Sequence, residues 1–241
     1  MPPVSYLAYQ DKTIGAFSWH ERRASGATFT WSGVRSIEAE AVPQTVQPIS
    51  LALDDVGVPH AAFHLYRAGL FGIPAYRPLL AGTRMTLDNG MGASRDVGWG
   101  VDLALGGTRR AATFVKVPTD GLGDGEIRVA TWDAAVGTVT TRAVQQGIRR
   151  TADGYLPRVT SSFDRWGTLH QVYSVTINGQ WSLTYRRETA DGAVVEDYID
   201  EKMRDGEESL VDMLVDPDGR PHIVYFDPTT GYVRYATRFD R

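Results

Sequence analysis

The chain contains no cysteine, which excludes disulfide bonds, thiolate metal centres and a cysteine nucleophile. It also lacks an excess of charge of one sign, because 25 basic residues are scattered among 29 acidic ones, for a net charge of −4. Nucleic acids and membranes are therefore not expected partners, since both require a concentrated basic or apolar surface. No stretch approaches the roughly 18 apolar residues that span a bilayer, and the N-terminus has no export signal. We expect a cytoplasmic protein, or a secreted one if a leader has been removed.

What the sequence does contain is a repeat. The segment VRYATR at 233–238 is matched by IRVATW at 127–132, LTYRRE at 183–188, FSWHER at 17–22 and, more loosely, IPAYRP at 73–78. Their equivalent positions recur about every 54 residues, and are Trp19, Tyr76, Val129, Tyr185 and Tyr235. The sequence therefore predicts one domain, 1–241, built from five copies at about 1–43, 44–90, 91–147, 148–204 and 205–241.

Each copy has the pattern of short strands, with alternating apolar residues, many β-branched and aromatic residues, and Gly, Asp and Pro between the runs. Four strands in about 50 residues are typical of a propeller blade. We predict an all-β fold, a β-propeller of about five four-stranded blades; an immunoglobulin-like sandwich would explain no five-fold repeat.

The two terminal copies are incomplete. The first begins at a second strand near Val4, and the fifth stops after a third strand near Arg238. Three explanations stay open: incomplete terminal blades, part of a longer propeller, or cover by another chain. Because unpaired strand edges invite pairing, self-association through open blade edges is one expectation.

The pattern Asp-x-x-Gly-x-Pro-His, an apolar run with Tyr and Asp, then Gly and Tyr-Ala-x-Arg resembles the repeat of bacterial sialidase-like (BNR-like) β-propellers. Segment 162–168 resembles the sialidase Asp-box with one extra residue, and 71–74 resembles the Phe-Arg-Ile-Pro motif. Gly72 stands in place of the arginine that binds the sialidase substrate's carboxylate. The resemblance thus implies the fold, and function has to be inferred from the site.

Three of the five histidines, His60, His170 and His222, occupy equivalent positions at the start of predicted second strands, where the other copies have Tyr6 and Arg110. A metal site would require the three rings to converge on one ion, whereas second strands stand away from the propeller axis. We therefore predict that each imidazole bonds a group in the turn of its own blade, and that no metal is held there.

Polar residues recur at one position of the predicted first strands: Ser50, Asp102, Thr160 and Asp212. They line a wet central channel or touch a ligand at its mouth. If the protein is an enzyme, Asp102 and Asp212 are its candidate catalytic acid and base, since nearby carboxylates with divergent pKa values suit glycoside cleavage.

Loops that lead into the first strands supply further candidate ligand contacts. The predicted loop 88–100 carries Trp99 for stacking and Arg95 for hydrogen bonding, and segment 149–158 carries Tyr155 and Arg158. An arginine such as Arg158 suits a carboxylate or sulfate. We predict that Trp99, Asp102, Tyr155, Arg158 and Asp212 meet at the channel mouth.

The predicted loop 117–126 of the third copy contains Asp120, Asp124 and Glu126. Their oxygens are of the kind that calcium prefers, but their spacing is not that of a calcium loop. The sequence therefore predicts no cofactor, with calcium at these residues as the alternative.

Three functions remain open from the sequence. The first is a lectin-like protein that binds a glycan or another small polar ligand on the channel-mouth face. The second is an enzyme that acts on a glycan or small metabolite through channel carboxylates. The third is a scaffold that presents the propeller face to another protein.

Overall fold

The computed structural model describes residues 4–11, 16–25, 28–38, 49–65, 72–90, 95–118, 124–148, 157–177, 180–203, 210–227 and 229–238. All regular elements in these ranges are β-strands, arranged in five antiparallel sheets that follow one another along the chain. The prediction of an all-β propeller with about five blades is confirmed. No helix long and apolar enough to cross a membrane occurs in the described part of the chain.

Blades 1 and 2 come from the N-terminal part of the chain. Blade 1 contains β1 (Val4–Asp11), β2 (Ala16–Ser25), β3 (Thr28–Trp31) and β4 (Arg35–Glu38). Both β3 and β4 pair with β2, so they share the place of one outer strand, and the described part of blade 1 has no inner first strand. Blade 2 contains β5 (Ile49–Leu53), β6 (Pro59–Leu65), β7 (Ile73–Pro78) and β8 (Met85–Thr86).

Blades 3 and 4 have four strands each, and the described part of blade 5 has fewer. Blade 3 contains β9 (Arg95–Gly106), β10 (Arg109–Pro118), β11 (Gly125–Asp133) and β12 (Thr140–Ile148). Blade 4 contains β13 (Val159–Phe163), β14 (Leu169–Ile177), β15 (Gln180–Glu188) and β16 (Val194–Met203). The described part of blade 5 has three strands, β17 (Val211–Val215), β18 (Pro221–Asp227) and β19 (Tyr232–Thr237). The predicted incompleteness of both terminal blades is thus borne out in the described residues.

The predicted alignment of the third strands is confirmed by strand register. Each of the five aligned residues faces an equivalent residue of the second strand in its own blade. The pairs are Trp19 with Ala8, Tyr76 with Ala62, Val129 with Thr113, Tyr185 with Val172, and Tyr235 with Val224.

The cores lie between successive blades, because side chains alternate across each strand and every sheet therefore has two faces to cover. We call the face toward the following blade the forward face, and the other the rear face. Phe17 on the forward face of blade 1 packs on Phe63 on the rear face of blade 2, with ring centroids 5.1 Å apart. Tyr76 of blade 2 likewise packs on Trp132 of blade 3, at 4.8 Å.

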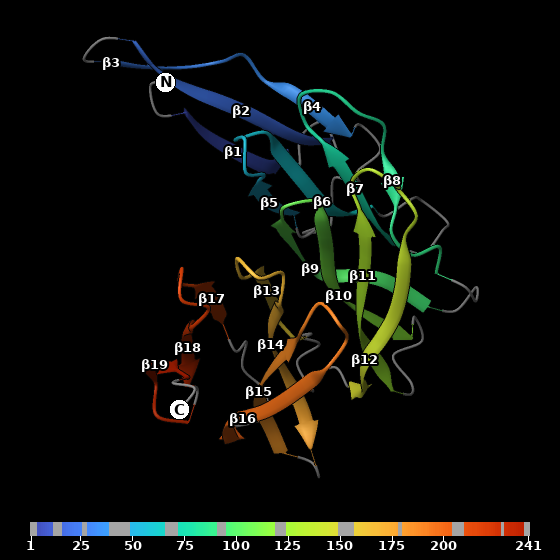
Figure 1. Ribbon diagram of the computed structural model, residues 1–241, viewed down its shortest axis with the longest axis vertical. Coiled ribbons are helices and arrows are strands. Elements are labelled where there is room, and N and C mark those ends of the chain that lie inside the picture. Colours follow the sequence, from blue (N-terminus) through green and yellow to red (C-terminus); the bar gives the residue numbers. More distant parts are fainter. Residues whose placement is uncertain are drawn as a thin grey trace.

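Figure 1 shows the blades arranged as an arc, with blade 1 at the top and blade 5 at the lower left. Strand contacts run from β1 to β5 and then along the inner strands β5, β9, β13 and β17. No comparable strand contact joins blade 5 to blade 1 in the described ranges. Within the described residues, the propeller is therefore open between its first and last blades.

The predicted equivalence of Arg110 with the histidines is wrong by one residue. In blade 2, Leu53 pairs with Pro59 across a five-residue turn, whereas in blade 3 Gly106 pairs with Arg109 across two residues, Gly107 and Thr108. The shorter hairpin shifts the register, so that Ala111 occupies the histidine position.

Candidate functional site

The four polar residues of the first strands do occupy one register position. Each of them pairs with the second-strand residue that faces the aligned third-strand residue of its blade. The pairs are Ser50 with Ala62, Asp102 with Thr113, Thr160 with Val172, and Asp212 with Val224.

Asp102 joins the inner strands of three blades. Its Oδ1 accepts a hydrogen bond from Ser50 Oγ of blade 2 at 2.9 Å. Its Oδ2 accepts two from Ser161 of blade 4, from the backbone N–H at 2.6 Å and from Oγ at 3.1 Å. Ser50 Oγ in turn accepts a hydrogen bond from the N–H of Leu103 at 3.0 Å. The sequence alignment did not single out Ser161, because it lies one residue beyond the shared polar position.

Burial raises the pKa of the Asp102 carboxyl, and the negative charge of Asp212 raises it further. The hydrogen bonds from Ser161 and Ser50 act in the opposite direction, because they stabilise the ionised form. In all three hydrogen bonds Asp102 is the acceptor, so each of its two carboxylate oxygens already has a donor from a neighbouring blade. This geometry suits a tie between blades better than a group that exchanges protons with a substrate.

Asp212 and Arg158 border an open hollow at the end of the molecule where β17 begins and β18 ends. Its volume is about 510 Å³. Its lining consists of Arg158, Leu210, Val211, Asp212, Val224, Tyr225, Phe226 and Val233. The walls are mostly apolar and aromatic, with one guanidinium and one carboxylate at the rim. Asp212 Oδ1 accepts a hydrogen bond from the N–H of Met213 at 2.8 Å.

Trp99 does not line this hollow and lies in β9, opposite Val115. Its ring centroid is 5.1 Å from that of His64 in blade 2, and it packs against the core between blades 3 and 4. The predicted loop 88–100 is therefore partly wrong, since β9 already begins at Arg95. Gly98 permits the extension, because its φ is +111° and a Cβ there would lie 2.9 Å from the backbone nitrogen of Pro74.

The structure places the other predicted contacts only in part. Tyr155 lies outside the described residues, and of Arg95 the backbone alone is described, paired with Pro118. Thr160 is buried in β13. The structure therefore brings Arg158 and Asp212 together at one hollow, with Asp102 close enough for the charge of Asp212 to affect its pKa.

The three equivalent histidines each bond a turn carboxylate and a tyrosine of their own blade. In blade 4, His170 Nε2 lies 3.3 Å from Asp164 Oδ2, and Nδ1 lies 2.7 Å from Tyr185 Oη. The other oxygen of Asp164 accepts hydrogen bonds from the N–H groups of Trp166 and Thr168, which fix the turn. The predicted bond from each ring to a turn group of its own blade is confirmed, while the tyrosine partner was not foreseen.

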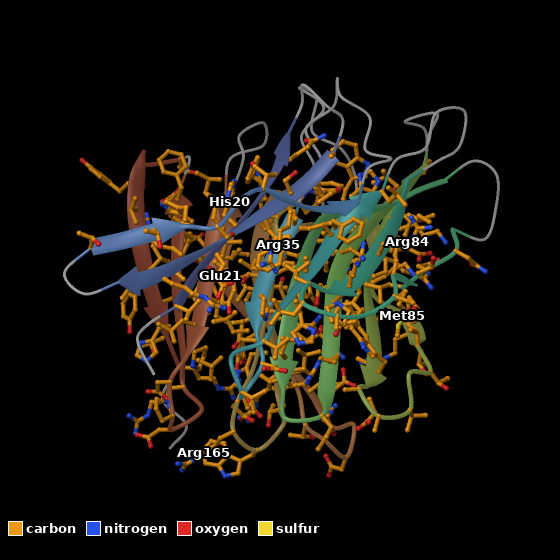
Figure 2. All side chains as sticks on the ribbon, turned by 90° about the horizontal axis from the view of Figure 1, so that it is seen from above. His20, Glu21, Arg35, Arg84, Met85 and Arg165 are labelled. Carbon is orange, nitrogen blue, oxygen red and sulfur yellow. The ribbon has the colours of Figure 1, made fainter. Side chains whose placement is uncertain are left out.

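Blades 2 and 5 repeat this arrangement. The corresponding distances to the carboxylate and to the tyrosine are 3.3 and 2.6 Å for His60, with Asp54 and Tyr76, and 3.2 and 2.7 Å for His222, with Asp216 and Tyr235. Burial lowers the pKa of the His60 imidazole, although the Asp54 hydrogen bond opposes the shift. These clusters close the turns between first and second strands, at the end of each blade opposite the hollow. Figure 2 labels Arg165 in the turn of blade 4 at this end.

The acidic segment before β11 is described only from Asp124, so Asp120 lies outside the described residues. Glu126 pairs with Arg128, with 2.7 Å between Oε2 and Nη1. No group of three His, Asp or Glu side chains that suits a metal occurs in the described ranges. The expectation of no cofactor, with calcium at this segment as the alternative, stays a prediction.

No family model and no curated protein matches the chain. Solved structures similar to it include TolB from Acinetobacter baumannii, with 14% identity and a TM-score of 0.46 over 99% of this chain and 53% of that chain. An endo-arabinase from Bacteroides thetaiotaomicron has 11% identity and a TM-score of 0.47 over 100% and 95%. A glycosyl hydrolase from Bacteroides ovatus has 9% identity and a TM-score of 0.43 over 98% and 84%. The chain spans about half of that TolB. At these identities the likeness concerns the fold alone, and the sialidase-like resemblance stays one of repeat pattern.

Proposed function

We propose that the protein is lectin-like and binds a glycan, or a small polar ligand of similar chemistry, in the hollow beside Arg158 and Asp212. The observation that supports the proposal is the combination of apolar and aromatic walls with one cation and one anion at the rim. A sugar ring presents an apolar face and a belt of hydroxyl groups, so it fits a site of that composition.

Each rim residue has a distinct role in this proposal. The Arg158 guanidinium donates hydrogen bonds to ring or hydroxyl oxygens, and the Asp212 carboxylate accepts hydrogen bonds from hydroxyl groups. Because the two side chains carry opposite charges, a neutral polyhydroxylated ligand suits the rim better than a strongly charged one. Phe226 and the exposed Val224 and Val233 provide apolar surface against which a sugar face packs.

Binding is favoured over catalysis by the state of Asp102. An acid–base pair would need an oxygen of Asp102 that is open to substrate, whereas both oxygens accept hydrogen bonds from neighbouring blades. One observation still favours the alternative that the protein is an enzyme, namely the raised pKa of Asp102. A carboxyl group that donates a proton at neutral pH requires such a shift.

The test is a glycan array together with a general glycosidase screen, followed by titration of any hit. Arg158→Ala and Asp212→Asn should each weaken binding by about tenfold or more, because each removes a charge-assisted hydrogen bond. Arg220→Ala and Asp218→Asn are the matched controls, since both residues are exposed in the turn at the opposite end of blade 5. They should bind as the unaltered protein does.

The outcomes separate the candidates. Loss of binding in the rim variants but not in the controls supports the lectin. Turnover that disappears in Asp102→Asn while binding is retained would instead establish the enzyme. Equal affinity of all variants for an identified ligand would place the site elsewhere.

A further inference from the structure

The forward face of blade 5 is apolar and exposed. By strand register it carries Asp212, Leu214, His222, Val224, Phe226, Val233, Tyr235 and Thr237. The opposite side of this sheet packs on blade 4 through Met213, Ile223 and Tyr225. Leu214, Val224, Val233 and Tyr235 are all exposed large hydrophobic residues. Contiguous apolar exposure of this kind is typical of an interaction surface.

In the other blades, the residues at these positions are covered by the following blade. On blade 5 the same positions are exposed, because no blade in the described residues packs on them. Tyr76 is 5% exposed and Tyr185 is 3% exposed, because the following blade covers each of them, whereas Tyr235 is 59% exposed. Each of the three tyrosines binds a histidine in the same way. Blade 5 is thus formed as the covered blades are, but its forward face lies open.

The rear face of blade 1 is the other open end of the arc. Its described strands present an aromatic strip, in which Tyr9 stacks on His20 at 5.6 Å and His20 meets Trp31 edge-on at 6.1 Å. Arg22 lies over the Trp31 ring at 5.8 Å, and Leu7 is exposed beside the strip. Figure 2 looks down on blade 1 and labels His20 there.

We propose that the forward face of blade 5 docks on the rear face of blade 1 of a second copy of this chain. Every interface between successive blades joins the forward face of one blade to the rear face of the next. The exposed forward face of blade 5 and the exposed rear face of blade 1 are therefore the two kinds of face that pack together in this fold. By register, Arg22 holds the place that Trp132 has in blade 3, and Trp132 packs on Tyr76, the equivalent of Tyr235. Arg22 and the Trp31 ring beneath it therefore meet Tyr235 in the docked pair.

A second copy suits the two ends because, in the described residues, no strand contact of the kind that joins successive blades links blade 5 to blade 1. Charge favours the same pairing, since Arg22 is cationic, while Asp212 and Asp216 lie at the forward face of blade 5. The contact is head to tail, so two copies close on each other, or further copies add in series, according to the rotation between them.

Docking would also complete the hollow. Val224 and Val233 belong both to the forward face of blade 5 and to the lining of the hollow, so a docked copy forms its missing wall. The docking proposal does not depend on ligand binding, and its test is made without ligand.

The cysteine-free chain allows a direct test by cross-linking. Val224→Cys and Leu7→Cys place one thiol on each face, at the positions of Ala62 and Ala112, which share a core between blades 2 and 3. On oxidation, or with a short bis-maleimide, a mixture of the two single variants should give covalent dimers that neither variant gives alone. The double variant, with both Val224→Cys and Leu7→Cys, serves as the control. If it cross-links within one chain at high dilution and the mixture of single variants gives no dimer, the proposal is overturned and the propeller closes on itself within one chain.

Sedimentation analysis across the micromolar range provides the second measurement. The unaltered chain should show a concentration-dependent mass of two copies or more, and Leu214→Arg should weaken self-association by about tenfold or more. Val136→Arg is the matched control, because Val136 is an exposed valine in the turn between β11 and β12 of blade 3. A monomeric unaltered chain at all concentrations, or equal weakening by both variants, would refute the proposal.

Discussion

Replacing His170 and His222 by alanine tests whether burial gives the repeated His–Asp–Tyr clusters their stabilising effect. The two imidazoles make the same pair of hydrogen bonds with nearly the same distances. Their side chains differ in exposure, at 3% for His170 and 35% for His222. Alanine at 170 removes the hydrogen bonds to Tyr185 Oη and Asp164 Oδ2 in a closed core.

The expected loss of unfolding free energy for His170→Ala is about 2–4 kcal/mol, which combines the loss of two buried hydrogen bonds and the space left by the ring. For His222→Ala it is about 1 kcal/mol or less, since water reaches the groups that the ring leaves. A loss at His222 as large as that at His170 would be expected if the two rings were equally buried.

Urea unfolding followed by tryptophan fluorescence measures both values, at a dilution where sedimentation shows single chains. Dilution is needed because docking would cover His222. Equal losses for the two variants would refute the argument from burial. A loss for His222→Ala that grows with protein concentration would agree with the docking proposal.

Three further outcomes are expected. Arg186→Ala should lower the unfolding free energy by about 2–4 kcal/mol, because it removes the buried hydrogen bonds of Arg186 to Glu188 and Gln171, while Arg142 still pairs with Glu188; urea titration measures the loss, and a value near zero would contradict this account. Burial raises the pKa of the Glu188 carboxyl, but hydrogen bonds from Arg186 and Arg142 outweigh burial and hold this pKa below its ordinary value of 4.5. The stabilisation of the fold by ionised Glu188 is therefore fully present above pH 4.5 and declines as the pH falls below it. Glu188→Gln should flatten this acid dependence, and an unchanged slope would refute it. Gly219→Ala should be more destabilising than Gly57→Ala, because both have φ near +80° but only at Gly219 would a Cβ meet Trp166, at 2.5 Å. In a Trp166→Ala background the difference in thermal midpoint between the two glycine variants should vanish, and its persistence would assign the cost to another contact.

Much of the fold follows from periodic sequence features. Alternation of apolar residues predicts strands because successive side chains point to opposite faces of a sheet. The repeat predicts which strands are equivalent, and the register pairs of Tyr76, Tyr185 and Tyr235 confirm it. The alignment failed at Arg110, where the turn is shorter by three residues, because a hairpin's loop length sets its register.

The candidate site was predicted less completely, for reasons that lie in packing. Trp99 was assigned to a loop because glycines surround it, yet β9 continues through these glycines and its indole packs on His64. The hydrogen bonds of Asp102 to Ser50 and Ser161 connect residues more than 50 positions apart, and no local pattern announces them.

The sequence by itself predicted the strands and their grouping into five repeats. These are local properties, because they depend on alternation, turn chemistry and copy number along the chain. Which residues at equivalent positions of the repeats are buried by a neighbouring blade was decided only by the tertiary structure. Tyr185 and Tyr235 have equivalent histidine partners and the same register, but a following blade packs on Tyr185 and none in the described residues packs on Tyr235. Burial depends on what lies across the face of a sheet, and that neighbour comes from a distant part of the chain or from another molecule.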